Sequence, residues 1–241
     1  MATVKQHYAE VLADVYLWMF DGYDRAVANN LEFFNRHQIH PYRSGLAVDL
    51  GAGCGFQSIP LAQLGFNVIA IDLDAKLIKE LKANSQELDI NAIEEDLINF
   101  PQHIEGPAEL IVCMTDTILH LESKNKVRSL FHKVFDSLAE KGTFIITFRD
   151  LTSELSDLDR FISLKSDEQT ILTCFLEYEP ETVKVHDLVY RKNYSGWQLN
   201  KSFYRKLRLS KQWVEQELKK AGLRQIDSTI NNGLVTAIAS K

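Results

Sequence analysis

The chain has 241 residues, of which 45% are hydrophobic and 25% are charged, and its formal net charge is −6 at pH 7. This composition predicts a folded domain with a sizeable core and excludes a disordered chain. The acidic balance disfavours general affinity for nucleic acid or anionic membranes, and no apolar run reaches the roughly 18 residues that a membrane span requires.

The predicted elements begin with helices. Apolar residues recur at helical spacing over residues 8–34, and Gly22 predicts a break between two helices. From residue 46, short apolar strands alternate with amphipathic helices, which is typical of a parallel sheet covered on both faces. The strands are predicted at 46–50, 68–71, 90–93, 110–114 and 143–148, and the helices at 56–64, 74–84 and 123–138.

After residue 150 the apolar residues alternate with period two, and turn signals occur at Glu179–Pro180 and Ser195–Gly196. We expect three antiparallel strands here, which form a small appended sheet. Ser210 then caps a helix that runs to Ala221, with Gly222 as its stop. Two last strands near 224–229 and 234–239 are joined by an Asn-Asn-Gly turn.

The predicted fold is therefore α/β, with a Rossmann-like, seven-stranded, mostly parallel sheet and helices on both of its faces. We expect one domain with four parts, namely N-terminal helices over 1–44, a core over 45–150, the appended antiparallel sheet over 168–209, and a last helix and strand pair over 210–241.

Cysteine usage and local charge add two expectations. The three cysteines are widely separated, which predicts reduced thiols in a reducing, cytoplasmic compartment, and no secretory signal or metal-ligand spacing is recognised. Residues 184–224 contain eleven Lys or Arg and three Asp or Glu. This basic stretch is either a solvated surface or a face for an anionic substrate.

The stretch AVDLGAGCGFQSIPLAQLGFNVIAIDLD, residues 47–74, indicates a ligand site. A glycine-rich turn after a parallel strand lets the backbone approach a ligand, and Asp72 at the end of the next strand can accept hydrogen bonds from both hydroxyls of a ribose. Phe56 stands where a dinucleotide fingerprint has its third glycine. Asp49, before the turn, suits an ammonium or sulfonium group better than a pyrophosphate.

With these motifs the sequence resembles the class I S-adenosylmethionine (SAM)-dependent methyltransferases. VDLGAGCG is similar to their first motif and VIAIDLD to their second, and EEDLINF, AELIVCMTDTILHL and LAEKGTFIITF resemble the later ones. The resemblance covers residues 46–148 by motif and about the last thirty by topology. The appended sheet is similar to that of small-molecule N- and O-methyltransferases, such as those acting on glycine, where it roofs the acceptor pocket together with N-terminal helices.

The resemblance implies SAM as the cofactor and assigns roles to individual residues. Backbone contacts to its methionine part are implied for Gly51, Ala52, Gly53 and Gly55. Asp49 would hold the amino group, directly or through water, and Asp72 the ribose. Leu73, Asp96 and Leu97 would contact the adenine, and Met114 would lie near the sulfonium. Leu73, Leu97 and Met114 are equally well explained as core residues.

Methyl transfer from a sulfonium requires alignment of the acceptor, exclusion of water and sometimes removal of a proton. Three candidates for catalysis follow the fourth and fifth strands. His120 is either a general base or structural, Asp116 lies close to it in sequence, and Arg149 either binds an acceptor carboxylate or pairs with Asp150 or Asp116. The candidates for acceptor binding are Tyr8, Tyr16, Tyr23, Tyr204 and Arg205, with core packing as the alternative for the three tyrosines of the N-terminal helices.

The predicted function is methyl transfer to a nitrogen or oxygen atom of a small metabolite. The alternatives are a Rossmann-type NAD-dependent oxidoreductase, an RNA or protein methyltransferase that uses the basic stretch, and a binding module without activity. "MTDT" stands after the fourth strand, where enzymes that methylate amino groups of nucleic acids often carry Asn/Asp-Pro-Pro-aromatic, so a nucleic-acid acceptor is not expected. The appended sheet can also form the contact of a homodimer.

Overall fold

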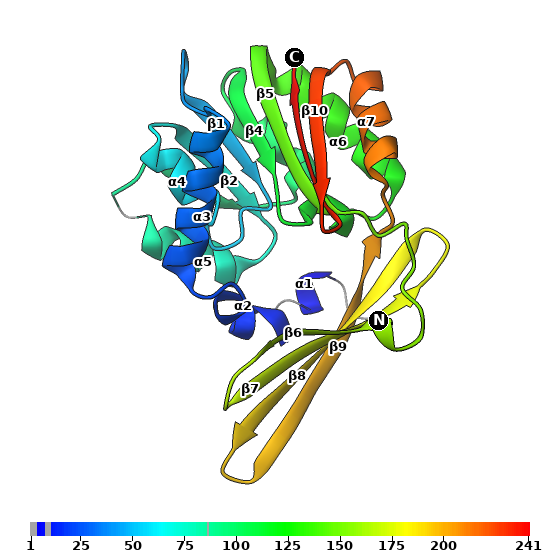
Figure 1. Ribbon diagram of the computed structural model, residues 1–241. Helices are drawn as coiled ribbons and strands as arrows, with labels where there is room; N and C mark the ends of the chain where they lie inside the picture. The colour runs from blue at the N-terminus through cyan, green and yellow to red at the C-terminus, as the bar shows by residue number, and fades with distance from the viewer. Residues whose placement is uncertain (1–3, 8–10, 86) are drawn as a thin grey trace.

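The computed structural model describes residues 4–7, 11–85 and 87–241, which form two sheets with the first two helices between them (Figure 1). The strands of the large sheet follow the order β10-β11-β5-β4-β1-β2-β3. The neighbouring strands β5, β4, β1, β2 and β3 run parallel to one another, and β11 pairs antiparallel with both β5 and β10. The bounds are β1 Leu46–Leu50, β2 Asn67–Asp72, β3 Ile90–Glu94, β4 Ala108–Cys113, β5 Leu138–Arg149, β10 Arg224–Asn231 and β11 Leu234–Ser240. The predicted Rossmann-like sheet is confirmed.

Three of the described α-helices begin at a capping side chain. The carboxylate of Asp74 accepts from the backbone N–H of Lys76 at 2.8 Å and of Leu77 at 3.1 Å, and Ser123 and Ser210 cap later helices in the same way. The helices are α1 Val4–His7, α2 Ala13–Met19, α3 Tyr23–Arg36, α4 Ser58–Gln63, α5 Ala75–Asn84, α6 Lys124–Ser137 and α7 Lys211–Lys220. Short 3₁₀ helices lie at Leu97–His103, Thr117–His120 and Asp157–Arg160.

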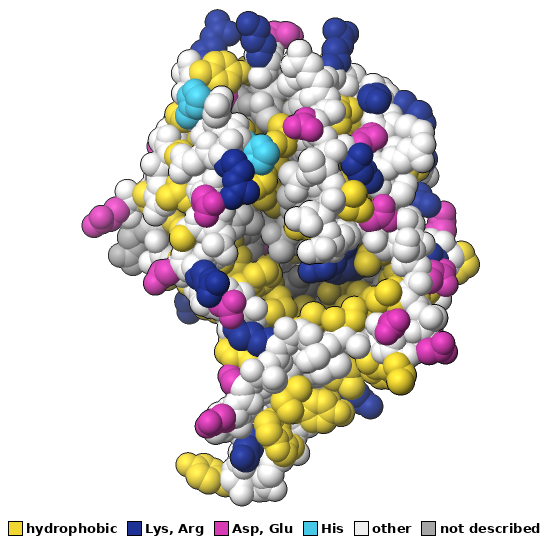
Figure 2. Space-filling model, in the orientation of Figure 1, with side chains coloured by type: hydrophobic (Ala, Val, Ile, Leu, Met, Phe, Trp, Pro, Cys, Tyr) yellow, Lys and Arg dark blue, Asp and Glu magenta, His cyan; other side chains and the backbone are white. Residues whose placement is uncertain are grey.

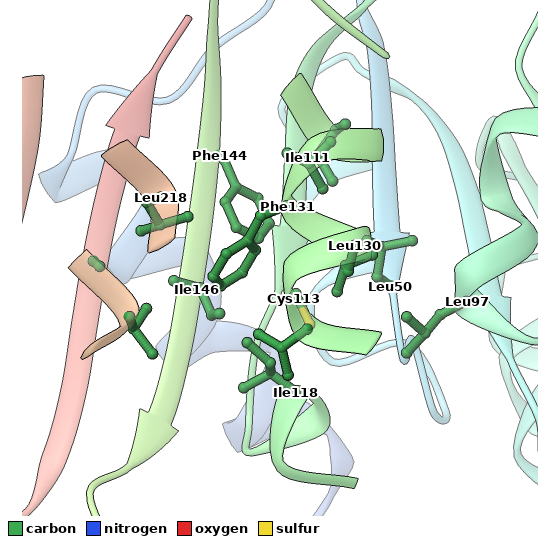
Figure 3. Close-up of a cluster of buried hydrophobic side chains, with 14 of the residues drawn as sticks. Leu50, Leu97, Ile111, Cys113, Ile118, Leu130, Phe131, Phe144, Ile146 and Leu218 are labelled. Atoms are coloured by element: carbon green, nitrogen blue, oxygen red, sulfur yellow. The ribbon is translucent and has the colours of Figure 1, made fainter. Parts of the chain in front are cut away.

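The core consists of two hydrophobic layers, one on each face of the large sheet. Figure 3 shows the first layer, in which Phe131 of α6 packs edge-on against Phe144 of β5 with ring centroids 6.0 Å apart. The second layer, which includes Phe34 of α3 and Ile59 of α4, covers the other face. Every residue of β4 is buried, as expected for a central parallel strand.

A buried carboxylate holds the entry to β1. Glu109 is 3% exposed and accepts from the backbone N–H of Tyr42 at 2.8 Å and of Gly45 at 3.0 Å. Burial by itself would raise the pKa of this carboxyl, but the backbone donors outweigh it and the pKa lies below its ordinary value.

We expect Glu109→Gln to destabilise the fold by about 1–3 kcal/mol at pH 7, because the amide turns a donor toward buried N–H groups. A lowered pKa in the folded state means that this carboxylate stabilises the protein above its unfolded pKa and ceases to do so as the pH falls through its folded pKa. Denaturant unfolding at pH 7 and in acid measures the free energy of unfolding of wild type and of the Gln variant. A difference between them that grows in acid would contradict this explanation.

The appended sheet has four antiparallel strands in the order β6-β7-β8-β9. They are β6 Phe161–Ser166, β7 Thr170–Tyr178, β8 Thr182–Asn193 and β9 Gly196–Leu207. The prediction of three strands was wrong because β6 is an exposed edge strand whose register shifts between Ser163 and Lys165, which removes a readable alternation. The inner face of this sheet packs on residues around α2, with Val15 against the cluster that contains Leu172 and Val185.

None of the helices in the described part of the chain is long and apolar enough to cross a membrane.

Candidate active site

A cavity of about 630 Å³ lies beyond the carboxyl ends of the central strands, between the large sheet and β9. Figure 2 shows the corresponding hollow above the appended sheet, with hydrophobic side chains along it. Ligands of open α/β sheets bind at this end, where the strand order reverses between β1 and β4.

The glycine turn after β1 forms one wall of this cavity. The backbone N–H groups of Gly51 and Ala52 donate to the carbonyl of Ile71 at 2.8 Å and 3.0 Å, which ties the turn to β2. Gly51 has φ +78°, and an added Cβ would overlap the side chain of Thr117. Gly55 has φ +100°, and its Cβ would overlap Leu81. Both positions therefore require glycine.

Asp72 braces the glycine turn from the end of β2. One carboxylate oxygen accepts from the N–H of Gly53 at 2.8 Å, and the other accepts from the N–H of Asp74 at 2.8 Å. Burial raises the pKa of Asp72, although these backbone donors oppose the shift. The side chain also lines the cavity, so it can reach a ligand there.

Asp49 lies beneath the turn and is only 1% exposed. Its Oδ2 accepts from the hydroxyl of Ser58 at 2.6 Å, while Oδ1 has no hydrogen-bond partner among the described residues. Burial raises the pKa of Asp49 to about 7, against the opposing hydrogen bond from Ser58. This oxygen fits a donor that reaches it from the cavity side, either directly or through water.

The adenine residues implied by the resemblance lie together at one end of the cavity. Leu73 is 45% exposed although it is apolar, and it lines the cavity with Asp96 and Leu97. Asp96 also caps the 3₁₀ helix by accepting from the N–H of Ile98 at 2.9 Å. Met114, in contrast, packs in the core beside the sheet and is not among the residues that line the cavity.

His120, in the 3₁₀ helix after β4, and Tyr204 of β9 also line the cavity, on the β4 side of the glycine turn, which we call the acceptor end. Their rings are stacked with centroids 5.2 Å apart and an interplanar angle of 28°. Burial lowers the pKa of His120 to about 3, and the positive charge of Lys206 adds to this shift. The imidazole is therefore neutral at physiological pH.

Asp116 and Arg149 do not line the cavity. Asp116 accepts from Lys206 Nζ at 2.7 Å and from the N–H of Arg149 at 2.7 Å, and the Arg149 guanidinium lies 3.8 Å away. Although burial opposes it, Lys206 lowers the pKa of Asp116. Of the alternatives expected for Arg149, the structure shows the ion pair with Asp116, and the catalytic roles of both residues stay predictions.

The other predicted acceptor residues are placed differently. Tyr16 lines the cavity and stacks on Phe56 with centroids 5.8 Å apart. Arg205 lines it too, with a two-pronged ion pair to Glu179 at 2.7 Å and 2.9 Å. Tyr23 is not a lining residue, and its hydroxyl donates to the carbonyl of Cys54 at 3.2 Å. Tyr8 lies outside the described residues.

Sequence reasoning missed several lining residues. Gln57 is buried, lines the cavity, and donates to the hydroxyl of Thr115 at 3.2 Å. Thr115 has a positive φ of 57°, which is unusual for a β-branched residue. Phe203 precedes the predicted Tyr204 on β9. The position of Gln57 just after the glycine turn was the one signal that could have identified it.

Comparison with known proteins identifies the core. A family model described as a methyltransferase domain matches residues 47–142, which contain the glycine turn, Asp72 and His120. This segment is therefore similar to a methyltransferase domain. The resemblance predicted from the motifs is confirmed over this segment.

Relatives and solved structures agree with this domain. A glycine/sarcosine N-methyltransferase of Parasynechococcus marenigrum (strain WH8102) is 25% identical over 61% of this chain and 52% of its own length, so this chain spans about half of that relative. A SAM-dependent methyltransferase from Clostridium acetobutylicum superposes with a TM-score of 0.72 at 17% identity, covering 97% of this chain and 95% of the other. An amino pentose methyltransferase, CalS10 from Micromonospora echinaspora, superposes with a TM-score of 0.71 at 11% sequence identity, covering 90% of each chain. At these identities the solved structures show the shared fold.

Proposed function

We propose that this protein is a SAM-dependent methyltransferase that methylates a nitrogen or oxygen atom of a small metabolite. The observation that supports it most strongly is the glycine turn, in which two glycines have no room for a Cβ and Asp72 holds the N–H of Gly53. The turn lies in the segment that matches the methyltransferase family model. The printed names of its relatives favour nitrogen over oxygen as the accepting atom.

The residues around the cavity fit SAM. The unpartnered oxygen of Asp49 suits the ammonium of the methionine part, Asp72 suits the ribose hydroxyls, and exposed Leu73 suits the flat face of an adenine. Bound SAM supplies an activated methyl group on sulfur. The protein itself must then orient the acceptor and exclude water.

The acceptor end supports a neutral nucleophile. His120 carries no charge, and burial beside Lys206 disfavours a second cation there. Burial would also disfavour the charged form of an amine bound at this end, and the neutral amine is the form with a lone pair. The imidazole can hydrogen-bond such an amine or a hydroxyl, and Tyr204 and Tyr16 can pack on the acceptor.

The basic stretch gives little support to an RNA or protein acceptor, because many of its cations have acidic partners. The ion pairs that its cations form include Lys184 with Glu177, Arg205 with Glu179, Lys206 with Asp116, Arg208 with Glu154, Lys211 with Glu215 and Lys220 with Glu217. NAD remains disfavoured because Phe56 packs between aromatic rings where a dinucleotide fold has glycine. Three buried free thiols fit the proposed cytoplasmic location, and a homodimer through the appended sheet stays a prediction.

Calorimetry and methyl transfer test the proposed function. We expect micromolar or tighter binding of SAM and of S-adenosylhomocysteine (SAH), and no heat from NAD. With methyl-labelled SAM we expect label in at least one of glycine, sarcosine and glucosamine, which are small amines of the kinds that the relatives' names suggest. Binding of NAD without binding of SAM would overturn the proposal.

A further inference from the structure

A buried polar pair lies behind the acceptor end of the cavity. His7 of α1 and Asp187 of β8 are joined by a contact of 2.9 Å between Nε2 and Oδ2, and their side chains are 0% and 4% exposed. The two residues are 180 positions apart in the chain. Figure 1 shows α1 in the space between the appended sheet and the large sheet.

Tyr204 connects this pair to the cavity. The centroids of the His7 and Tyr204 rings lie 4.4 Å apart. Tyr204 also stacks on the ring of His120, with centroids 5.2 Å apart. Tyr204 is 6% exposed and lines the cavity together with His120. The order of contacts is therefore Asp187, His7, Tyr204, His120, from the interior of the appended sheet to the proposed acceptor.

The apolar surroundings of the pair argue against a purely structural role, because burying its carboxylate there costs free energy of folding. The inner face of the appended sheet is otherwise a hydrophobic layer, in which Leu172, Leu176, Val183 and Val185 are buried. Desolvating a carboxylate in such a layer opposes folding, and apolar residues of similar volume often hold two elements together equally well. A carboxylate bonded to an imidazole does, however, fix the orientation of that ring and the nitrogen that carries its proton.

We propose that His7 and Asp187 are positioning residues for the acceptor end. Asp187 orients the ring of His7, His7 restrains the ring of Tyr204, and Tyr204 holds the imidazole ring of His120 at the cavity wall. The helix α1 thus completes a site whose other parts come from the loop after β4 and from β9. This inference rests on the proposed function, because only an acceptor makes the orientation of His120 matter.

Two substitutions remove the pair from opposite sides, Asp187→Asn and His7→Phe. The matched control is Glu177→Gln, which alters another carboxylate–histidine contact, the 3.1 Å pair with His186 on the opposite face of the same sheet. We expect kcat for the methylated amine to fall about 10- to 100-fold in both test variants, with SAH affinity by calorimetry within about twofold of wild type. The control should keep its kcat.

A second readout needs no acceptor. In the SAH complex, or in the free protein, the ring-nitrogen NMR signals of His120 should shift in Asp187→Asn and His7→Phe and stay in place in Glu177→Gln. If His120 signals and kcat match wild type in a folded test variant, the inference is wrong. Failure of the wild type to bind SAH or to methylate any amine would count against the proposed function instead, while the NMR comparison still decides whether Asp187 positions His120.

Discussion

Gly51→Ala is expected to destabilise the fold by about 2–4 kcal/mol and to abolish measurable SAM binding. Gly51 has φ +78°, and its added Cβ would lie 2.9 Å from the Cβ of Thr117 and closer still to both atoms beyond it. Thr117 cannot easily move away, because its hydroxyl donates to the carbonyl of Met114 at 2.8 Å. Denaturant unfolding and calorimetry with SAM measure the two effects.

Gly53→Ala is the matched control two residues further on. Its φ is +54°, and its Cβ would meet nothing closer than Leu77 at 3.9 Å, so only the backbone cost of about 1 kcal/mol applies. We expect the Gly53 variant to be clearly more stable than the Gly51 variant. Equal destabilisation of the two would refute the explanation by steric overlap.

Asp72→Ala is expected to weaken SAM binding about 100-fold or more in calorimetry. The substitution removes the acceptor for the N–H of Gly53 at 2.8 Å and, in the proposed complex, the acceptor for the ribose hydroxyls. Each hydrogen bond to a charged group contributes about 1.5–3 kcal/mol, so loss of the two bonds from the ribose hydroxyls reaches this magnitude. The fold should survive, because the hydrophobic layers do not depend on Asp72.

Asp72→Asn tests the contribution of the negative charge, because the amide has nearly the same shape as the carboxylate. It keeps one acceptor oxygen, and we expect an intermediate loss of about tenfold. Because burial raises the pKa of Asp72, the wild-type carboxylate becomes protonated at a higher pH than an ordinary aspartate. Wild-type affinity for SAM should therefore begin to fall in mild acid, whereas that of the Asn variant should change less. Undiminished binding by the Ala variant would refute the proposed role of Asp72.

Much of the large sheet was predictable because its signals are local. The apolar run of β4, the capping side chain of Asp74 and the Asn-Asn-Gly turn before β11 each act through neighbours within a few residues. The strand β6 was missed because an exposed edge strand with a register shift has no regular alternation. The 3₁₀ helices had no distinct period either.

The cofactor end of the site was predicted more fully than the acceptor end. The positions of Asp72, Leu73 and Asp96 on the cavity follow from strand ends, which all parallel strands bring to the same edge. Which side chains turn into the cavity at the other end depended on packing between distant segments. His120 lines it, whereas Asp116, four residues earlier, is held away by Lys206.

The sequence by itself determined the succession of strands and α-helices in the large sheet, the glycine turn and the acid that follows it, because each depends on backbone preferences and periodicity over short stretches. Only the tertiary structure decided the pairing of Asp116 with Lys206, 90 residues apart, and of His7 with Asp187, 180 residues apart. Such partners meet because α1 packs on β9 and β9 packs against the 3₁₀ helix after β4. A linear pattern carries no record of which buried polar groups that packing will bring together.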